Sequence, residues 1–194
     1  MIQRLTDATA ELVVELHKKV LGHTLNAQMG SGFLRRLYVA TNNSTDNGFC
    51  YIFMDENRVL GFISFCLDHA RLETEIMGSL RFKEKAMIFR SLLCRPWLLP
   101  ALLRQQLFSK YVGRHYSQPY TTILTLGVSP DAHGRGIGRQ LVDAARETVR
   151  RRGAGELFVD TEETNTQAAL FYRKYGFRQV AVKYGNIVLK TVIV

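Results

Sequence analysis

Apolar positions in the first third of the chain follow helical spacing and then form strand-like runs. Leu12, Leu16 and Val20 fall on one stripe of a helix, and Thr6 or Asp7 is placed to cap it. Two apolar runs then flank a polar turn, which is typical of a β-hairpin. The predicted elements are a short strand at 2–6, helices at 7–21 and 31–40, and strands at 49–54 and 59–67.

Strands and amphipathic helices alternate again in the last third of the chain. A strand at 123–128 precedes a helix that starts near Gly138, and a second strand, a short helix and a final strand at 187–194 follow. Such alternation is typical of α/β folds. The sequence therefore predicts a single α/β domain over residues 1–194.

Composition narrows the class of protein. Of the 194 residues, 46% are hydrophobic, which is enough for one buried core. No run of about 20 apolar residues is present, so we expect no membrane-spanning helix. Acids inside the apolar pattern of the first residues argue against a signal peptide. Cys50, Cys66 and Cys94 lack C-x-x-C spacing, so we expect no metal, no disulfide scaffold and a cytoplasmic location.

A glycine-rich segment, residues 133–138, joins the strand at 123–128 to the helix that follows it. Glycines leave backbone N–H groups open to an oxyanion, and the start of a helix adds the positive end of its dipole. The spacing G-x-G-x-G is not the dinucleotide fingerprint, and the G-K-[ST] of a Walker loop is missing. The segment predicts an anion site, and the alternative is a surface turn before a helix.

The run V-S-P-D-A-H-G-R-G-I-G resembles the signature loop of the GNAT N-acetyltransferase superfamily. Gly136 and Gly138 match the two glycine positions of that pattern, and Val128 and Pro130 match the V-x-P before it. His133 stands where the family usually has Arg or Gln, whose side chain helps to order the loop. The phosphate contact of that side chain therefore stays open here, whereas the backbone cradle does not depend on it.

A second signature of the family, N-x-x-A-x-x-[LF]-Y-x-K-x-G-F, is matched later in the chain. The matching residues are Asn165, Ala168, Phe171, Tyr172, Lys174, Gly176 and Phe177. Asn165 is also a good helix cap, and Tyr172 would fit a core position. The two motifs in this order favour a functional role for Tyr172, and the clear resemblance covers residues 121–184.

The resemblance implies a mixed, mostly antiparallel sheet flanked by helices and splayed around an acetyl-CoA cleft. It implies an enzyme that transfers an acetyl group from acetyl-CoA to an amine. The oxyanion of that reaction needs a donor, for which a backbone N–H near Leu126 or Val128 is the candidate. The residues implied in acetyl-CoA binding are Leu126, Gly127, Val128, His133, Gly134, Arg135, Gly136, Ile137, Gly138, Arg139, Asn165 and Tyr172.

Two side chains are candidates for proton transfer. The resemblance makes Tyr172 the donor to the leaving thiolate. Because a tyrosine pKa is near 10 and a thiol pKa near 8.5, full transfer costs about 2 kcal/mol, and a hydrogen bond to the sulfur is the alternative. Glu162 is the candidate general base. Asp160 and Glu163, at the end of the same strand, and a water relay are the alternatives.

Residues 70–118 depart from the short turn that the family usually has at this place. They predict two or more helices, broken at Pro96 and Pro100, and they carry a net charge of +6 out of the total of +9. We expect this insertion to form a wall of the acceptor site and to favour a small anionic amine, for instance a nucleotide-linked amino sugar. The alternative is a solvated helical hairpin that packs on the core or on a second subunit of a homodimer.

Two other classes of function stay open. A CoA-binding sensor or interaction module would keep the fold without turnover, and a nucleic-acid-binding protein would use the basic charge. No recognised nucleic-acid motif is present, so we expect a small-molecule partner and no nucleic acid. Acyl groups longer than acetyl are open as well.

Overall fold

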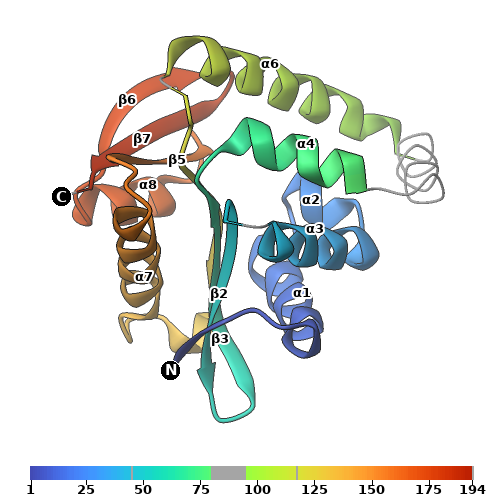
Figure 1. The fold of residues 1–194 in the computed structure, drawn as a ribbon. Coiled ribbons are helices and arrows are strands. Elements are labelled where there is room, and N and C mark those ends of the chain that lie inside the picture. Colours follow the sequence, from blue (N-terminus) through green and yellow to red (C-terminus); the bar gives the residue numbers. More distant parts are fainter. Residues whose placement is uncertain (45, 80–94, 117, 194) are drawn as a thin grey trace.

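The centre of the molecule is one twisted, mixed sheet (Figure 1). The computed structural model describes residues 1–44, 46–79, 95–116 and 118–193. Within these residues the strand order is β1-β2-β3-β4-β5-β7-β6, and β4 with β5 is the one parallel pair. The strands are β1 (Ile2–Arg4), β2 (Gly48–Asp55), β3 (Arg58–Cys66), β4 (Thr122–Val128), β5 (Glu156–Glu162), β6 (Arg178–Lys183) and β7 (Asn186–Val192). The predicted mixed, mostly antiparallel sheet is confirmed.

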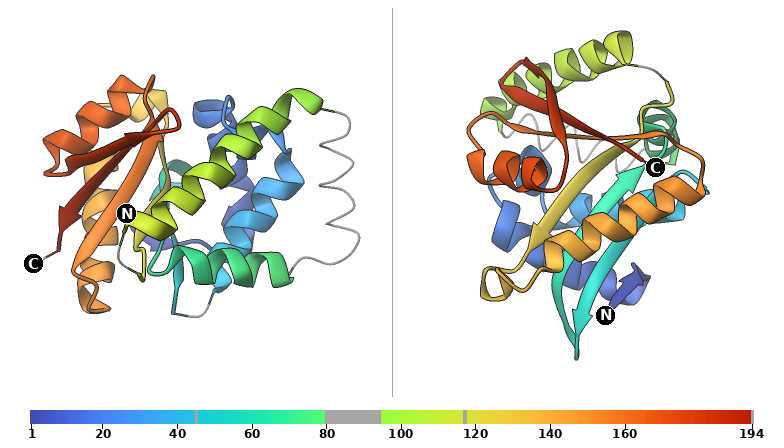
Figure 2. Two further views of the ribbon diagram at one scale, coloured as in Figure 1. Left: turned by 90° about the horizontal axis from the view of Figure 1, so that it is seen from above. Right: turned by 90° about the vertical axis from the view of Figure 1, so that its left-hand side faces the viewer.

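Helices cover both faces of this sheet. Two of them, α7 and α8, lie on one face, and the remaining α-helices lie on the other (Figures 1 and 2). The helices are α1 (Asp7–Leu21), α2 (Leu25–Gln28), α3 (Ser31–Asn43), α4 (His69–Ser79), α6 (Leu99–His115), α7 (Ile137–Arg151) and α8 (Thr166–Lys174), with short 3-10 turns η1 (Pro96–Leu98) and η2 (Pro130–Ala132). The short helix α2 was not predicted.

Helix α7 packs tightly against the sheet. Leu141, Ala145 and Val149, which recur every four residues, are fully buried. The helix passes so close to β3 that a Cβ on Gly61 would lie 2.8 Å from the Ile137 side chain. Burying a side chain such as Leu141 contributes about 2 kcal/mol. This packing fixes the start of α7 against the end of β4.

Helix α1 covers the opposite face, with the predicted bounds but a different buried stripe. Thr6 caps the helix by accepting a hydrogen bond from the Thr9 N–H. Its buried face is centred on Val13 and Val14, whereas Leu12 is 36% exposed. Of the predicted stripe, Leu16 is buried and Val20 packs against the core, so the prediction is wrong only for Leu12. Val13 and Val14 pack against apolar residues of β2 and β3.

The insertion contributes α4 and α6 to the same side of the sheet as α1. Pro96 begins η1, and Pro100 lies in the first turn of α6 rather than breaking it, since proline is tolerated there. Phe108 and Val112 of α6 pack on Phe158. In the described part of the chain, no helix has the length and apolar content to cross a membrane. Residues 80–94 of the insertion, including Cys94, lie outside the described residues.

Candidate active site

Strands β4 and β5 separate soon after they begin, which opens the sheet. They pair only at Thr122 with Phe158 and at Ile123 with Val159. The register of β4 against β3 shifts at this point, so that Leu124 is an extra residue on β4. Such a bulge bends its strand and increases the local twist. It turns the rest of β4 away from β5, and the two strands diverge like the arms of a V.

The backbone of β4 faces this opening at alternate residues. The Ser129 N–H bonds to the Leu60 carbonyl on the β3 side, 2.8 Å away. Because peptide groups alternate along a strand, those of Leu126 and Val128 point to the opposite side, toward the opening. The residue between them, Gly127, has no room for a side chain, because a Cβ at this position would lie 2.6 Å from the Phe62 ring.

The glycine-rich loop forms a cluster of open N–H groups at the start of α7. Gly134 and Gly136 have φ values of 79° and 73°, a region that side chains with a Cβ rarely adopt. The N–H groups from Gly136 to Arg139 have no hydrogen-bond partner among the described residues. Together with the dipole of α7, they form a site suited to an anion. Gly138 also allows close packing, since its Cβ would lie 3.3 Å from the Phe171 ring.

The polar side chains around this loop bond to other parts of the protein and do not extend over the open N–H groups. His133 Nε2 donates to the Val128 carbonyl at 3.1 Å, so His133 orders the loop even though it replaces the usual Arg or Gln. Arg135 pairs with Asp55 at 3.0 Å, and Arg139 lies 3.5 Å from Asp143. Any anion in the loop would therefore be held mainly by backbone N–H groups.

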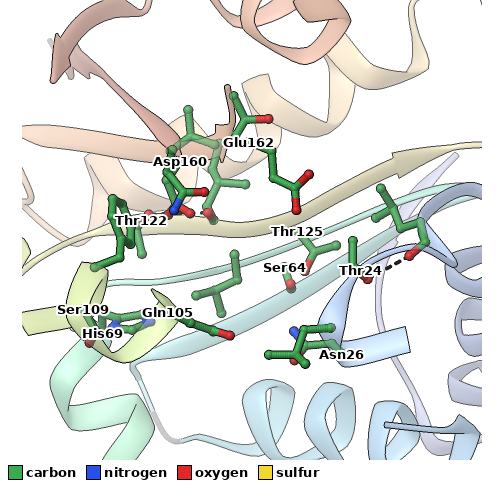
Figure 3. Close-up of a pocket in the computed structure, with 18 of the residues that line it drawn as sticks. Thr24, Asn26, Ser64, His69, Gln105, Ser109, Thr122, Thr125, Asp160 and Glu162 are labelled. Atoms are coloured by element: carbon green, nitrogen blue, oxygen red, sulfur yellow. Dashed lines mark hydrogen bonds between the residues drawn. The ribbon is translucent and has the colours of Figure 1, made fainter. Parts of the chain in front are cut away.

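A cavity of about 590 Å³ lies against the opening between β4 and β5. Its walls come from α1, α3, α4 and α6 on one side of the sheet and from β4, β5 and α8. Figure 3 shows Asp160 and Glu162 on one side, His69, Gln105 and Ser109 across from them, and Thr24 and Asn26 at one end. The expectation that the insertion forms a wall of this site agrees with the described parts of α4 and α6.

Asp160 and Tyr172 line this cavity from different elements. Asp160 is exposed at the cavity, and desolvation by the protein around it raises its pKa to about 6, against the opposing effect of His69. Tyr172 is only 5% exposed, and burial, followed by the charge of Asp160, raises its pKa well above the ordinary value. A carboxylate with a pKa near neutrality and a neutral phenol are a suitable pair for acid–base chemistry.

The other residues predicted near α8 divide into two groups. Asn165 lines the cavity and also caps α8, since its Oδ1 accepts from the Ala168 N–H at 3.1 Å. Glu162 lines the cavity and lies 3.8 Å from Arg104. Glu163 does not line the cavity, and its N–H bonds to the Gly185 carbonyl. Of the three acids considered from sequence, Asp160 and Glu162 therefore line the cavity and Glu163 does not.

Sequence reasoning missed two residues that lie beside Asp160. His69, at the start of α4, lies 4.0 Å from Glu73 and lines the cavity. Tyr120 precedes β4, and its buried hydroxyl has no hydrogen-bond partner in the described residues. A signal was present for Ser64, a polar residue in an otherwise apolar strand that also lines the cavity. No motif marked His69 or Tyr120.

A buried network closes the α1 end of the cavity without adding charge. Thr24 Oγ1 donates to the Leu21 carbonyl at 2.7 Å, so it accepts from His17 Nε2 at 3.2 Å. His17 Nδ1 then accepts from the Tyr38 hydroxyl at 2.6 Å. Burial, followed by the charge of His23, lowers the pKa of His17 to about 4, so the imidazole is neutral.

The model of the acetyltransferase (GNAT) family matches residues 21–177, which is most of the chain. The chain belongs to the GNAT acetyltransferase family. This membership confirms the resemblance seen in the glycine loop and the Asn165–Tyr172 motif.

Curated relatives in this family match over short segments. A mycothiol acetyltransferase of Beutenbergia cavernae is 43% identical over 65 residues, which cover 32% of this chain and 22% of the relative. A streptothricin acetyltransferase of Streptomyces lavendulae is 41% identical over 56 residues, covering 29% of this chain and 30% of the relative. The chain thus spans less than a third of the length of these GNAT relatives.

Solved structures match over nearly the whole chain. The PaiA N-acetyltransferase from Thermoplasma acidophilum, in complex with coenzyme A, is 13% identical with a TM-score of 0.62, over 99% of this chain and 98% of that one. An aminoglycoside 6'-acetyltransferase type Ii is 13% identical with a TM-score of 0.63, over 100% and 97% of the two chains. At this identity the likeness shows the GNAT fold.

In the described residues, no group of three or more His, Cys, Asp or Glu is placed to hold a metal.

Proposed function

We propose that the protein transfers an acetyl group from acetyl-CoA to the amine of a small acceptor, with residues 1–194 working as one domain. The observation that carries this proposal is the position of Asp160 and Tyr172 on one cavity, at the opening between β4 and β5. Membership of the GNAT family supports it. The proposed reacting groups and the anion-binding loop thus belong to elements that border one opening in the sheet.

The residues present fit acetyl-CoA. Its diphosphate would be held by the open N–H groups from Gly136 to Arg139, in the loop that His133 ties to Val128. Its pantetheine arm would pair with the peptide groups of Leu126 and with the N–H of Val128 on the open side of β4, since the Val128 carbonyl already accepts from His133. Acetyl-CoA supplies an acetyl group already activated as a thioester. A backbone N–H of this β4 edge is the proposed donor to the oxyanion.

Asp160 replaces Glu162 as the proposed general base. With a pKa of about 6, Asp160 is ionised at neutral pH and can accept a proton from an ammonium group. Taking that proton from an amine with a pKa near 8 costs about 3 kcal/mol, which a catalysed reaction can tolerate. Glu162 lies near Arg104, which favours a role in holding the acceptor.

Tyr172 is the proposed donor to the departing sulfur. Its raised pKa disfavours full proton transfer while Asp160 is charged. Once Asp160 has taken the proton of the amine, the nearby negative charge is gone and the pKa of Tyr172 falls. The phenol can then donate its proton to the departing thiolate, and the second proton that the acceptor nitrogen loses on forming the amide restores the phenol.

A turnover assay tests this proposal. Release of free coenzyme A from acetyl-CoA would be followed with a thiol reagent in the presence of a panel of amines. We expect amine-dependent release in the wild type and strong loss in Asp160→Asn. A CoA-binding module without activity would bind the coenzyme but release none with any amine. A nucleic-acid-binding protein would instead show salt-dependent affinity for DNA or RNA and no need for coenzyme A. Longer acyl-CoA donors in the same assay would define the acyl group.

A further inference from the structure

The carboxylates outnumber the arginine and lysine side chains among the described residues that line the cavity, although the protein as a whole carries +9. Glu73, Asp160 and Glu162 line the cavity. Arg104 is the one arginine or lysine among the described residues that does so, and it is 3.8 Å from Glu162. A concave site lined by charges of one sign concentrates ligands of the opposite sign.

Most of the basic side chains of the insertion that the structure describes do not line the cavity. Arg71 pairs with Glu75 at 2.7 Å, and Arg95 donates to the Gln28 carbonyl. Lys110 and Arg114 belong to α6 but do not line the cavity. The remaining basic residues of the insertion, Arg81, Lys83, Lys85 and Arg90, lie outside the described residues. Of the five basic residues of the insertion that the structure describes, Arg104 alone lines the cavity, so the net charge of the insertion differs from the charge of the described part of this wall.

The buried hydroxyl of Tyr120 points independently to a polar ligand. Tyr120 is only 3% exposed and lines the cavity, and although Thr122 lies near enough to act on its pKa, no hydrogen bond of ordinary length joins the Tyr120 hydroxyl to a described residue. Leaving such a group unpaired is unfavourable, so a ligand group that bonds to it would be stabilised. Burial, followed by the charge of Asp160, raises the pKa of Tyr120, so the phenol stays neutral.

Two of the carboxylates have a spacing suited to two cationic groups. Asp160 and Glu162 are two residues apart on β5, so their side chains project from the same face, with Cα atoms about 7 Å apart. A hydrogen bond of optimal length to an ion is shorter than 3 Å, so the 3.8 Å contact with Arg104 leaves Glu162 able to bind a further cation.

We infer that the acceptor is a small polycationic amine, with Asp160 facing the amine that is acetylated and Glu162 holding a second ammonium group. This inference rests on the proposed N-acetyltransferase function and narrows its substrate class. Tyr120 and the uncharged groups of Gln105 and Ser109 would complete the polar surroundings of the ligand. The second ammonium makes the acceptor complementary to a negative wall that would repel a carboxylate or phosphate.

Three probes of equal length test the inference. Diaminobutane, aminobutanol and aminobutyrate each carry a terminal amine on the same four-carbon chain, and the far end is positive, neutral or negative. Binding of each to the protein saturated with coenzyme A would be measured by calorimetry, and kcat/KM would be measured where turnover occurs. We expect diaminobutane to bind about tenfold more tightly than aminobutanol, and aminobutyrate to bind most weakly, because only the first pairs with Glu162.

Two matched variants test whether Glu162 causes the tighter binding of diaminobutane. Glu162→Gln should remove most of the advantage of diaminobutane, whereas Glu163→Gln, one residue away and outside the cavity, should keep it. Equal binding of the three probes, preference for aminobutyrate, or no binding of any at millimolar concentration would overturn the inference. These results would leave the proposed function intact as long as coenzyme A binds. Failure of coenzyme A itself to bind would overturn both.

Discussion

The Asp160 carboxylate and the Tyr172 phenol line one cavity, and the charge of Asp160 contributes to the raised pKa of Tyr172. Asp160 comes from β5, whereas Tyr172 comes from α8, which packs on the other face of the sheet. The two groups can act on the same ligand because β4 and β5 diverge between them. Proton gain by one therefore changes the acidity of the other.

Replacing Asp160 with asparagine tests its role as the general base. We expect kcat to fall by about two to three orders of magnitude, since the variant cannot accept a proton but keeps the shape of the side chain. Glu162→Gln should reduce kcat far less and act mainly on the KM of the acceptor. Steady-state kinetics of both variants make the comparison, and equal losses of kcat would return the role of base to Glu162.

The same Asp160→Asn variant should be more stable at neutral pH. Because folding raises the pKa of Asp160 from about 4 to about 6, the folded state holds the proton more tightly than the unfolded state. The resulting cost is absent below about pH 4, grows as the pH rises and is complete above about pH 6. The full shift corresponds to about 3 kcal/mol, and solvent access from the cavity reduces this to about 1 kcal/mol. Calorimetry at pH 7 should show a melting temperature higher by about 2–4 °C, and a lower one would contradict the account.

The pH dependence of activity should report Asp160 and its neighbour His69. Asp160 must be ionised to act as a base, so kcat/KM should fall as the pH drops below about 6. The positive charge of His69 lowers the pKa of Asp160, so His69→Gln should move this limb to higher pH. Rate profiles of the two proteins check the shift. A limb that stays in place would show that His69 does not act on Asp160.

Tyr172→Phe removes the hydroxyl while keeping the buried ring. We expect kcat to fall about ten- to a hundredfold, within the range for a single proton donor, with little change in coenzyme A affinity. Kinetics combined with calorimetric titration of coenzyme A distinguish these effects. Undiminished turnover in this variant would remove Tyr172 as the donor to sulfur.

Gly136→Val tests the anion site at the start of α7. Valine is strained at a φ of 73°, and the rearrangement should displace the N–H groups of the loop, so coenzyme A should bind at least about tenfold more weakly. Gly153→Val is the matched control, since Gly153 has a φ of 77°, open space around its Cβ, and a position at the far end of α7. Equal affinities of the two variants for coenzyme A would refute the assignment of the loop.

Local pattern was sufficient to predict most of the fold. The bounds of α1 agree with the prediction, and the hairpin of β2 and β3 agrees to within a residue at each end. The glycine loop was predictable because positive φ values and open amides at a helix start leave a sequence trace. Helix α2, with only four residues, is too short for apolar periodicity to reveal.

The acceptor side of the site was less predictable, because it depends on contacts between distant segments. His69 and Tyr120 have no motif, and they meet Asp160 only after α4 and β4 come together. The total charge of residues 70–118 does not say which of their side chains face the cavity. Glu162 and Asp160 also share the same strand face, so alternation could not choose between them.

A crystal structure with bound acetyl-CoA is the most direct test of the account. It predicts the diphosphate on the N–H groups from Gly136 to Arg139, the pantetheine arm along Leu126 and Val128, and the thioester sulfur within hydrogen-bond reach of the Tyr172 hydroxyl. Coenzyme density at another surface, or a thioester remote from both Asp160 and Tyr172, would contradict it.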